Sequence, residues 1–276
     1  MKRFILIITV LLGTFSIAIH AHAYEKGVDV KWMVFEATPS REWVEPFTGM
    51  EFVWIPAGCF MMGSPESEKG RKEYEGPVRK VCVDGFWMGK YEVTHGEWVT
   101  IMGKDPDYHY FDGFEKYPMS SVSWDDTQKF IQKLNGRGVG RFRLPTEAEW
   151  EYACRSGTTT RYSFGDTINT DQANYIEEIK PSIDSGSIKA VGTLGPNKFG
   201  LYDMHGNVWE WCEDTFEWYP PGPAQNPLIV KTDNPVRVVR GGSGFSSAEY
   251  LRSAFRGGYK ANERELLNGL RLVRNP

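Results

Sequence analysis

Residues 200–211 read GLYDMHGNVWEW, and this stretch is the densest pattern in the chain. Two of the ten tryptophans flank a single glutamate here. Around it run long irregular segments rich in Gly, Asn, Asp and Pro, with room for only short helices and strands. This combination predicts one compact α+β domain of low regular secondary structure, whose loops are held by aromatic anchors, calcium or disulfides. Loops of such length are often functional.

Short helices are predicted at three start signals, where a hydroxyl residue precedes an acidic first turn. The three helices are expected to begin after Thr94, Ser123 and Thr146 and to stop near Gly103, Gly136 and Gly157. Glutamates three residues after the two threonines complete capping boxes. Strands are predicted at residues 52–55, 81–83, 237–240 and 270–273.

The N-terminus predicts export. Lys2 and Arg3 precede an apolar run, and the small residues around His22 fit a cleavage site. We therefore expect a signal peptide at residues 1–23, an extended lead-in at 24–46 and one domain at 47–276. An uncleaved membrane anchor is the alternative, although the run is short for a span. Cleavage predicts a periplasmic or secreted protein with no membrane span.

Charge and motif content exclude several function classes. A net charge of −4 without a basic run gives no broad surface for nucleic acid. Beyond the predicted signal peptide only His95, His109 and His205 remain, with no HExxH and no pair at metal-ligand spacing. A zinc hydrolase or a histidine-held iron site is therefore not predicted. P-loop, GxSxG and GxGxxG motifs are also absent from the sequence.

Four cysteines in an exported chain make disulfides plausible, and four cysteines allow three pairings. Cys59 and Cys82 fall on two early strand candidates, which favours a bond between them. Cys154 would then have Cys212 as its only partner.

Seven motifs carry a family resemblance: IPAGCFMMGS, GFWMGKYEVT, PMSSVSWDD, RFRLPTEAEWEYACRSGT, KFGLYDMHGNVWEWCED, RVVRGGSGF and NGLRLVR. Their order and spacing resemble the sulfatase-modifying-factor family, whose founding activity is the formylglycine-generating enzyme. The resemblance implies a single α+β domain like a C-type lectin, stabilised by calcium. It also implies binding of an extended sulfatase segment, whose cysteine is oxidised by O₂ with copper held on two cysteines.

The copper site of that enzyme has no counterpart here. The resemblance places its two cysteines at Ser246 and Leu251, and the histidine that follows the first one at Ser247. A hydroxyl is a poor Cu(I) ligand and leucine is none, so copper is not expected.

The same loop remains the candidate for substrate binding. By resemblance Ser246, Ser247 and Glu249 are catalytic candidates, and Glu249 could act as an acid or base if it is desolvated. The substrate-binding candidates are Tyr250, Arg252 and Arg256. Alternatively, these arginines pair with carboxylates and Tyr250 fills the core.

Calcium is expected, by resemblance, at Asn207 and Glu210, whose amide and carboxylate oxygens suit this ion. A second site would involve Asn174 and the later Asp184. The alternative is that Asn207 occupies a left-handed turn and Glu210 pairs with an arginine.

Three functions remain open on the sequence. The first is a protein that binds a peptide, protein or peptide-derived ligand, or oxidises it without copper thiols, as some cysteine-less relatives do in maturing the siderophore pyoverdine. The second is a non-catalytic, lectin-like module for a protein or glycan. True formylglycine generation is disfavoured by Ser246 and Leu251.

Overall fold

The structure is a computed structural model that describes residues 6–13, 16–23, 34–36, 42–104, 113–177 and 187–276. The chain divides into two units, Met1–Arg41 and Glu42–Pro276. In the first unit, three antiparallel strands form a sheet in the order β1-β2-β3: β1 (Leu6–Gly13), β2 (Ser16–Ala23) and β3 (Val34–Glu36). The signal peptide and lead-in stay predictions, and part of each lies outside the described residues.

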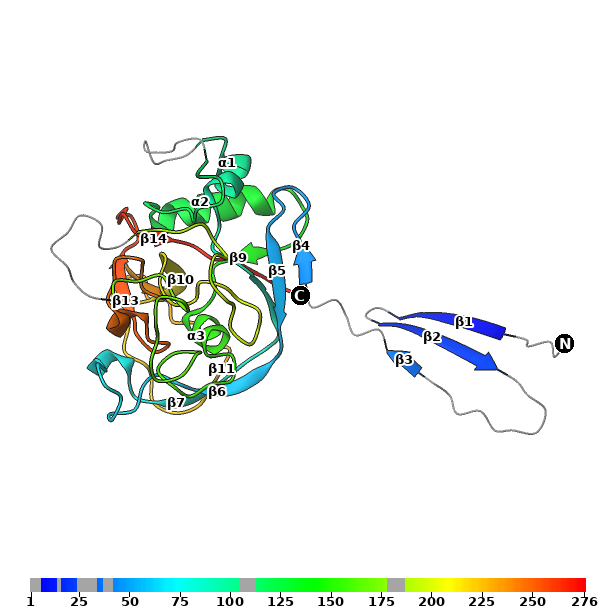
Figure 1. The fold of residues 1–276 in the computed structure, drawn as a ribbon, viewed down its shortest axis with the longest axis horizontal. Coiled ribbons are helices and arrows are strands. Elements are labelled where there is room, and N and C mark those ends of the chain that lie inside the picture. The colour runs from blue at the N-terminus through cyan, green and yellow to red at the C-terminus, as the bar shows by residue number, and fades with distance from the viewer. Residues whose placement is uncertain (1–5, 14–15, 24–33, 37–41, 105–112, 178–186) are drawn as a thin grey trace. The chain divides into compact units, whose positions relative to one another are not determined.

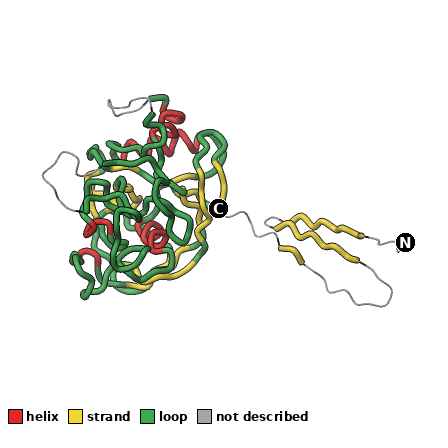
Figure 2. Tube along the Cα trace, in the orientation of Figure 1, coloured by secondary structure: helices red, strands yellow, loops and turns green. Residues whose placement is uncertain are grey.

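The second unit contains three small sheets connected by long loops (Figures 1 and 2). One sheet has the order β4-β5-β8-β15-β9, formed by β4 (Glu42–Val44), β5 (Glu51–Ile55), β8 (Phe86–Gly89), β15 (Val273–Arg274) and β9 (Phe142–Arg143). A second has the order β11-β7-β6, formed by β11 (Ala224–Gln225), β7 (Arg79–Val83) and β6 (Gly58–Met62). The third has the order β13-β12-β10-β14, formed by β13 (Gly257–Lys260), β12 (Val236–Arg240), β10 (Trp209–Thr215) and β14 (Asn268–Gly269). The predicted α+β class with little regular structure is confirmed.

Three α-helices start where their caps predict. They are α1 (His95–Met102), α2 (Trp124–Asn135) and α3 (Glu147–Arg155), and each has a reciprocal capping box. Thr94, Ser123 and Thr146 accept from the backbone N–H three residues later, and the acidic side chain at that position accepts from the cap N–H. Two 3₁₀ turns, η1 (Glu73–Glu75) and η2 (Ala248–Leu251), complete the helical structure described.

The strand predictions hold except at the C-terminus. Residues 52–55, 81–83 and 237–240 lie in β5, β7 and β12. The predicted strand at 270–273 is confirmed only at Val273, which begins β15, because Leu270, Arg271 and Leu272 form a buried connection between β14 and β15. A segment that is buried on all sides has a short apolar run like that of a strand, so the sequence pattern alone does not distinguish the two. At the other end of the domain, β4 begins at Glu42 and pairs with β5.

Aromatic side chains fill much of the core. Trp98 of α1 stacks on Phe130 of α2 with ring centroids 4.9 Å apart. Trp150 and Trp211 are fully buried, and each indole N–H has an acceptor: the Glu210 carboxylate for the first and the Val122 carbonyl for the second. Tryptophans of this kind connect loops to the helices and sheets.

One of the two predicted disulfides is confirmed and one is wrong. Cys59 and Cys82 are bonded across β6 and β7. Cys154 and Cys212 are free and buried. The thiol of Cys154 faces the Met204 carbonyl and Ser253 Oγ, each 3.7 Å from its sulfur, so α3 directs this side chain to polar partners in the core. None of the helices described is long and apolar enough to cross a membrane.

Candidate functional site

The loop between β12 and β13, residues 241–256, carries all the catalytic and substrate-binding candidates. It opens with Gly241 and Gly242, which have φ of +94° and +79°. A Cβ on Gly242 would lie 2.7 Å from Leu251 Cδ1, so the turn needs glycine for its conformation and for space. The RGGS motif is therefore a tight turn that lies against Leu251 of η2.

The three catalytic candidates lie on this loop without forming a catalytic arrangement. Ser246 Oγ is 3.0 Å from Ser243 Oγ and accepts from the Ser243 N–H. Ser247 precedes η2, and its side chain makes no capping bond. Glu249 pairs with Lys72 at 2.9 Å on the surface, and this contact lowers the pKa of its carboxyl. A surface carboxylate held in its ionised form is a weak general base.

Arg252 and Arg256 are inside the molecule. Arg252 donates to both carboxylate oxygens of Glu75, at 2.7 and 2.8 Å, and to Glu68 at 2.7 Å. Arg256 pairs with Glu147 and lies 4.1 Å over the Tyr219 ring. Neither guanidinium is exposed to solvent, so neither can reach a ligand at the surface. The structure places them in the alternative role, as pairs that fix the loop from beneath.

The outward side of the loop is aromatic and hydroxylic. Phe245 is 45% exposed and Tyr250 is 42% exposed, and the Tyr250 ring packs edge-on against Phe255. Ser246 and Ser247 are partly exposed between them. We call Phe245, Ser246, Ser247, Glu249 and Tyr250 the loop face.

Neither of the two positions that the resemblance assigns to the copper cysteines carries a thiol. Ser246 offers a hydroxyl, and Leu251 is fully buried against Tyr162, Ala173 and Tyr175. The residues present do not fit copper, because soft thiolate donors are what hold Cu(I).

A buried polar cluster beneath this loop was not found by sequence reasoning. His205 Nδ1 is 2.7 Å from the Leu251 carbonyl, and its Nε2 accepts from the Ser163 N–H at 3.1 Å. Cys154 Sγ lies 3.7 Å from the same Nε2. Burial lowers the pKa of His205 to about 4 and raises that of Cys154 to about 12, so both groups are neutral. The cluster holds the loop backbone and supplies no reactive thiolate.

The donors of the predicted calcium site are engaged with protein partners. Asn207, at φ +66°, accepts through Oδ1 from Asn174 Nδ2 at 3.0 Å and from the Lys189 N–H at 2.9 Å. The two oxygens of Glu210 accept from Arg271, and one also accepts from Trp150 Nε1 at 2.7 Å. As arranged, these residues do not fit a calcium ion, since a guanidinium already occupies the carboxylate. The calcium site stays a prediction, and Asp184 lies outside the described residues, as does His109.

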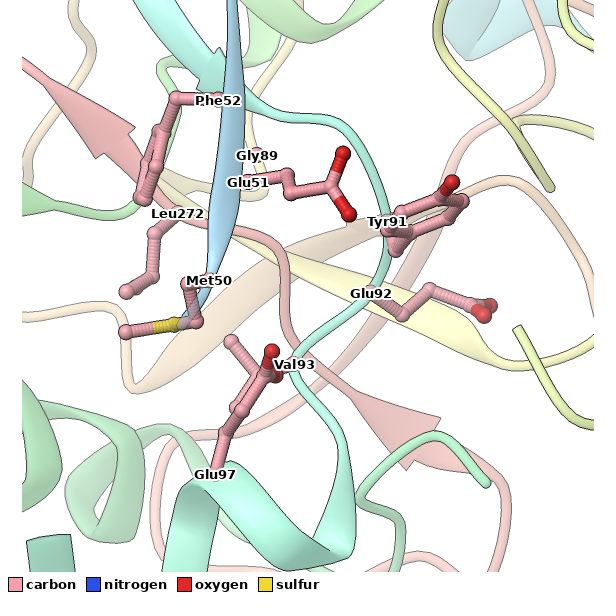
Figure 3. A pocket seen from close by; sticks show the side chains of 9 residues that line it. All are labelled: Met50, Glu51, Phe52, Gly89, Tyr91, Glu92, Val93, Glu97 and Leu272. Atoms are coloured by element: carbon pink, nitrogen blue, oxygen red, sulfur yellow. The ribbon is translucent and has the colours of Figure 1, made fainter. Parts of the chain in front are cut away.

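A second feature missed in the sequence is the buried acid Glu92. Its carboxylate accepts from Asn207 Nδ2 at 2.7 Å and from the Val208 N–H at 3.1 Å. Burial and the nearby Asp203 raise the pKa of Glu92 well above its ordinary value. A small cavity of about 10 Å³ lies beside Glu92 (Figure 3). It is also bordered by Glu51, which lies on β5, and by Glu97, which lies on α1. That volume holds at most one water, so these acids do not form a ligand pocket. Among the described residues, no group of three or more His, Cys, Asp or Glu is placed to hold a metal.

The fold defines a class of protein: a single compact α+β domain like a C-type lectin. Residues 38–276 match the sulfatase-modifying factor enzyme 1-like domain, and the chain belongs to that family.

Proteins similar to this chain carry names that point to different activities. The chain is 32% identical over 244 residues to the serine/threonine-protein kinase pkn1 of Chlamydia caviae, covering 75% of this chain and 35% of the kinase. It therefore spans about a third of the length of that relative. Against the formylglycine-generating enzyme of Mus musculus it is 28% identical, covering 74% of this chain and 69% of the enzyme. The solved structure of PvdO from Pseudomonas aeruginosa superimposes with a TM-score of 0.73 at 26% identity, covering 85% of this chain and 98% of that one.

Proposed function

We propose that this protein binds an extended peptide or protein segment at the loop face and does not carry out copper-thiolate oxidation. The observation that carries the proposal is the division of the loop into a fixed inner side and an open outer side. Arg252, Arg256 and His205 hold the backbone from within. Phe245 and Tyr250 are left as exposed aromatic groups beside serine hydroxyls.

This arrangement suits binding better than catalysis. Aromatic side chains on a rigid loop give contact area at low entropy cost, and hydroxyls supply adaptable hydrogen bonds. Glu249, the acid–base candidate, is an ionised partner of Lys72.

We also place the protein outside the cytoplasm. The Cys59–Cys82 bond is of the kind that persists in oxidising compartments, and the N-terminal apolar run predicts export. Periplasmic or secreted location remains part of the proposal.

Phage display of a random peptide library on the purified protein tests the binding function. We expect an enriched sequence whose affinity falls about tenfold or more in the Phe245→Ala/Tyr250→Ala variant, which corresponds to about 1.4 kcal/mol. Trp218→Ala removes an aromatic outside the loop that is 61% exposed, more than Phe245 or Tyr250, and serves as the control. Failure to enrich any sequence, or equal affinity in the double variant, would exclude the loop face; enrichment of a glycan on an array would favour the lectin-like alternative.

The second arm concerns chemistry. With copper, O₂ and a sulfatase-type cysteine peptide, we expect no aldehyde detectable by hydrazide labelling, because neither Ser246 nor Leu251 supplies a thiolate. Turnover of that peptide would overturn the assignment of both positions.

A further inference from the structure

The strand β6 has a free edge. It is the outer strand of the β11-β7-β6 sheet and pairs only with β7 among the described strands. Its sequence, GCFMM, contains no charged residue and no proline. Natural edge strands are usually protected by such residues, because unpaired N–H and C=O groups otherwise accept another strand.

The pairing register identifies which backbone groups face outward. Cys59 lies opposite Cys82, with Cα atoms 4.0 Å apart, the short spacing of a non-hydrogen-bonded pair. An independent contact agrees: the Cys82 carbonyl accepts from the Asn226 N–H at 2.8 Å, on the β11 side of β7. Because hydrogen bonding alternates along a strand, the N–H and C=O groups of Cys59 and Met61 point away from β7. No described residue forms a backbone bond with them outside the strand pairing.

A cavity lies beside this edge. It has a volume of about 320 Å³ and lies between β6 and residues 157–159, just after α3. Helix α3 itself packs against β6 (Figure 1). Phe60, Met61 and Tyr152 supply apolar walls, and Thr158 and Thr159 supply hydroxyls. This volume is within the range of ligand pockets and exceeds that of a single large side chain.

A positive charge stands at the same place. Lys80 lies directly opposite Met61 in the register, lines the cavity and is exposed. It makes no ion pair with any residue that the structure describes. The other cation of the lining, Arg155, donates to Glu151, the Thr160 carbonyl and the Gly63 carbonyl, so its charge is already compensated. The free charge at this edge is therefore that of Lys80.

We propose that β6 binds an extended acidic peptide segment, which adds a strand to the β11-β7-β6 sheet. The backbone of the segment pairs with the outward groups of Cys59 and Met61. Its apolar side chain enters the cavity between Phe60 and Tyr152. An acidic side chain next to it in the segment lies on the opposite face of the sheet, the face of Met61, and meets Lys80. This site uses none of the residues of the loop face and is independent of the function proposed there.

The probe is the heptapeptide Thr-Thr-Glu-Phe-Glu-Thr-Thr with acetylated and amidated ends, in which the phenylalanine and its two neighbouring glutamates point to opposite faces. Affinity is measured by fluorescence polarisation on the full-length protein. Met61→Pro removes one outward N–H without removing a bond to β7, and proline is tolerated on edge strands. We expect this variant to keep the wild-type melting temperature and to bind the probe about tenfold or more weakly. No binding by the wild type, or equal binding by a folded Met61→Pro, would overturn the proposal.

Charge reversal gives a second readout that does not depend on the proline variant. Lys80→Glu should weaken binding of the glutamate peptide and strengthen binding of the same peptide with lysines in place of glutamates. Lys133→Glu, on the exposed side of α2, is the matched control and should change neither affinity. An unchanged preference in Lys80→Glu would overturn the charge assignment. A dimer seen by sedimentation that Met61→Pro dissociates would show that a second copy, rather than an acidic peptide, occupies the edge.

Discussion

Four arginines with no exposed surface show how strongly context determines the role of a residue. Arg240, Arg252, Arg256 and Arg271 each pair with a glutamate inside the domain. A buried guanidinium is tolerated only with such a partner, and loss of one member leaves an uncompensated charge. These residues therefore maintain the positions of the loops, including the loop face, rather than contacting a ligand.

Glu97 allows a test of pH dependence at the residue scale. Burial raises its pKa to about 7, whereas an unfolded glutamate titrates near about 4.3. At a pH between these two pKa values, Glu97 is protonated in the folded state and ionised in the unfolded state. The free energy of unfolding therefore falls as the pH rises from about 4.3 to about 7, by up to about 1.4 kcal/mol per pH unit. Glu97→Gln keeps an acceptor for the Thr94 N–H and removes the titration.

We expect the free energy of unfolding of Glu97→Gln, relative to wild type, to increase from pH 4.5 to 7 and then to level off. Urea unfolding at several pH values measures it. Glu66→Gln, on the exposed segment after β6, is the control and should track the wild type. Parallel curves for Glu97→Gln and wild type would contradict a raised pKa at Glu97.

At the scale of elements, helix ends are determined locally and sheet edges are not. The hydroxyl and acidic residues that start α1, α2 and α3 are three positions apart, so their contacts form within one turn. The disulfide, by contrast, joins two strands whose pairing brings Cys59 opposite Cys82. It closes the connection that contains η1, whose Glu75 holds Arg252 of the loop.

Removing this disulfide should destabilise the domain. The double variant Cys59→Ser/Cys82→Ser loses a cross-link between residues 23 apart, which the chain-entropy model values at about 3 kcal/mol. Chemical unfolding measures the change, and peptide mapping without reduction identifies the bond. We expect Cys154 and Cys212 to react with iodoacetamide only after unfolding, because both are buried. Alkylation of Cys59 in the folded wild type would contradict the assigned bond.

At the scale of the whole molecule, long loops are held by side-chain contacts instead of regular structure. Asn207 bridges Asn174, Lys189 and Glu92, which belong to three separate segments. Arg271 connects Glu210 of β10 to the carbonyls of Gly89 and Tyr202. These contacts occupy the positions where the family resemblance predicts calcium.

The response to calcium distinguishes the two arrangements. We expect EDTA to leave the melting temperature unchanged, because protein partners already satisfy Asn207 and Glu210. If Ca²⁺ binds the folded state, chelation must instead lower the melting temperature and added Ca²⁺ must restore it. Differential scanning calorimetry with and without chelator measures this, and a reversible fall would establish the calcium site predicted from the sequence.

The sequence by itself determined the family, the fold class, the three helix starts and three of the four strand predictions. Each depends on short-range patterns or on motifs in a fixed order. It also singled out the loop between Arg240 and Arg256, in which the resemblance predicts Ser246 and Leu251 at the positions of the copper cysteines.

Only the tertiary structure decided which side chains of that loop face solvent. Arg252 and Tyr250 are two positions apart, yet one is buried against Glu75 and the other is exposed, because the partner of Arg252 lies 177 residues earlier in the chain. The surroundings of Cys154 are also set by distant residues, because its contacts come from His205 and Ser253. Residues Leu270–Leu272 have the apolar pattern of a strand because they are buried, although they lie outside the strands. The free edge of β6 also emerges only from the order of strands in the sheet. Burial and pairing are set by segments distant in sequence, so no local pattern could have predicted them.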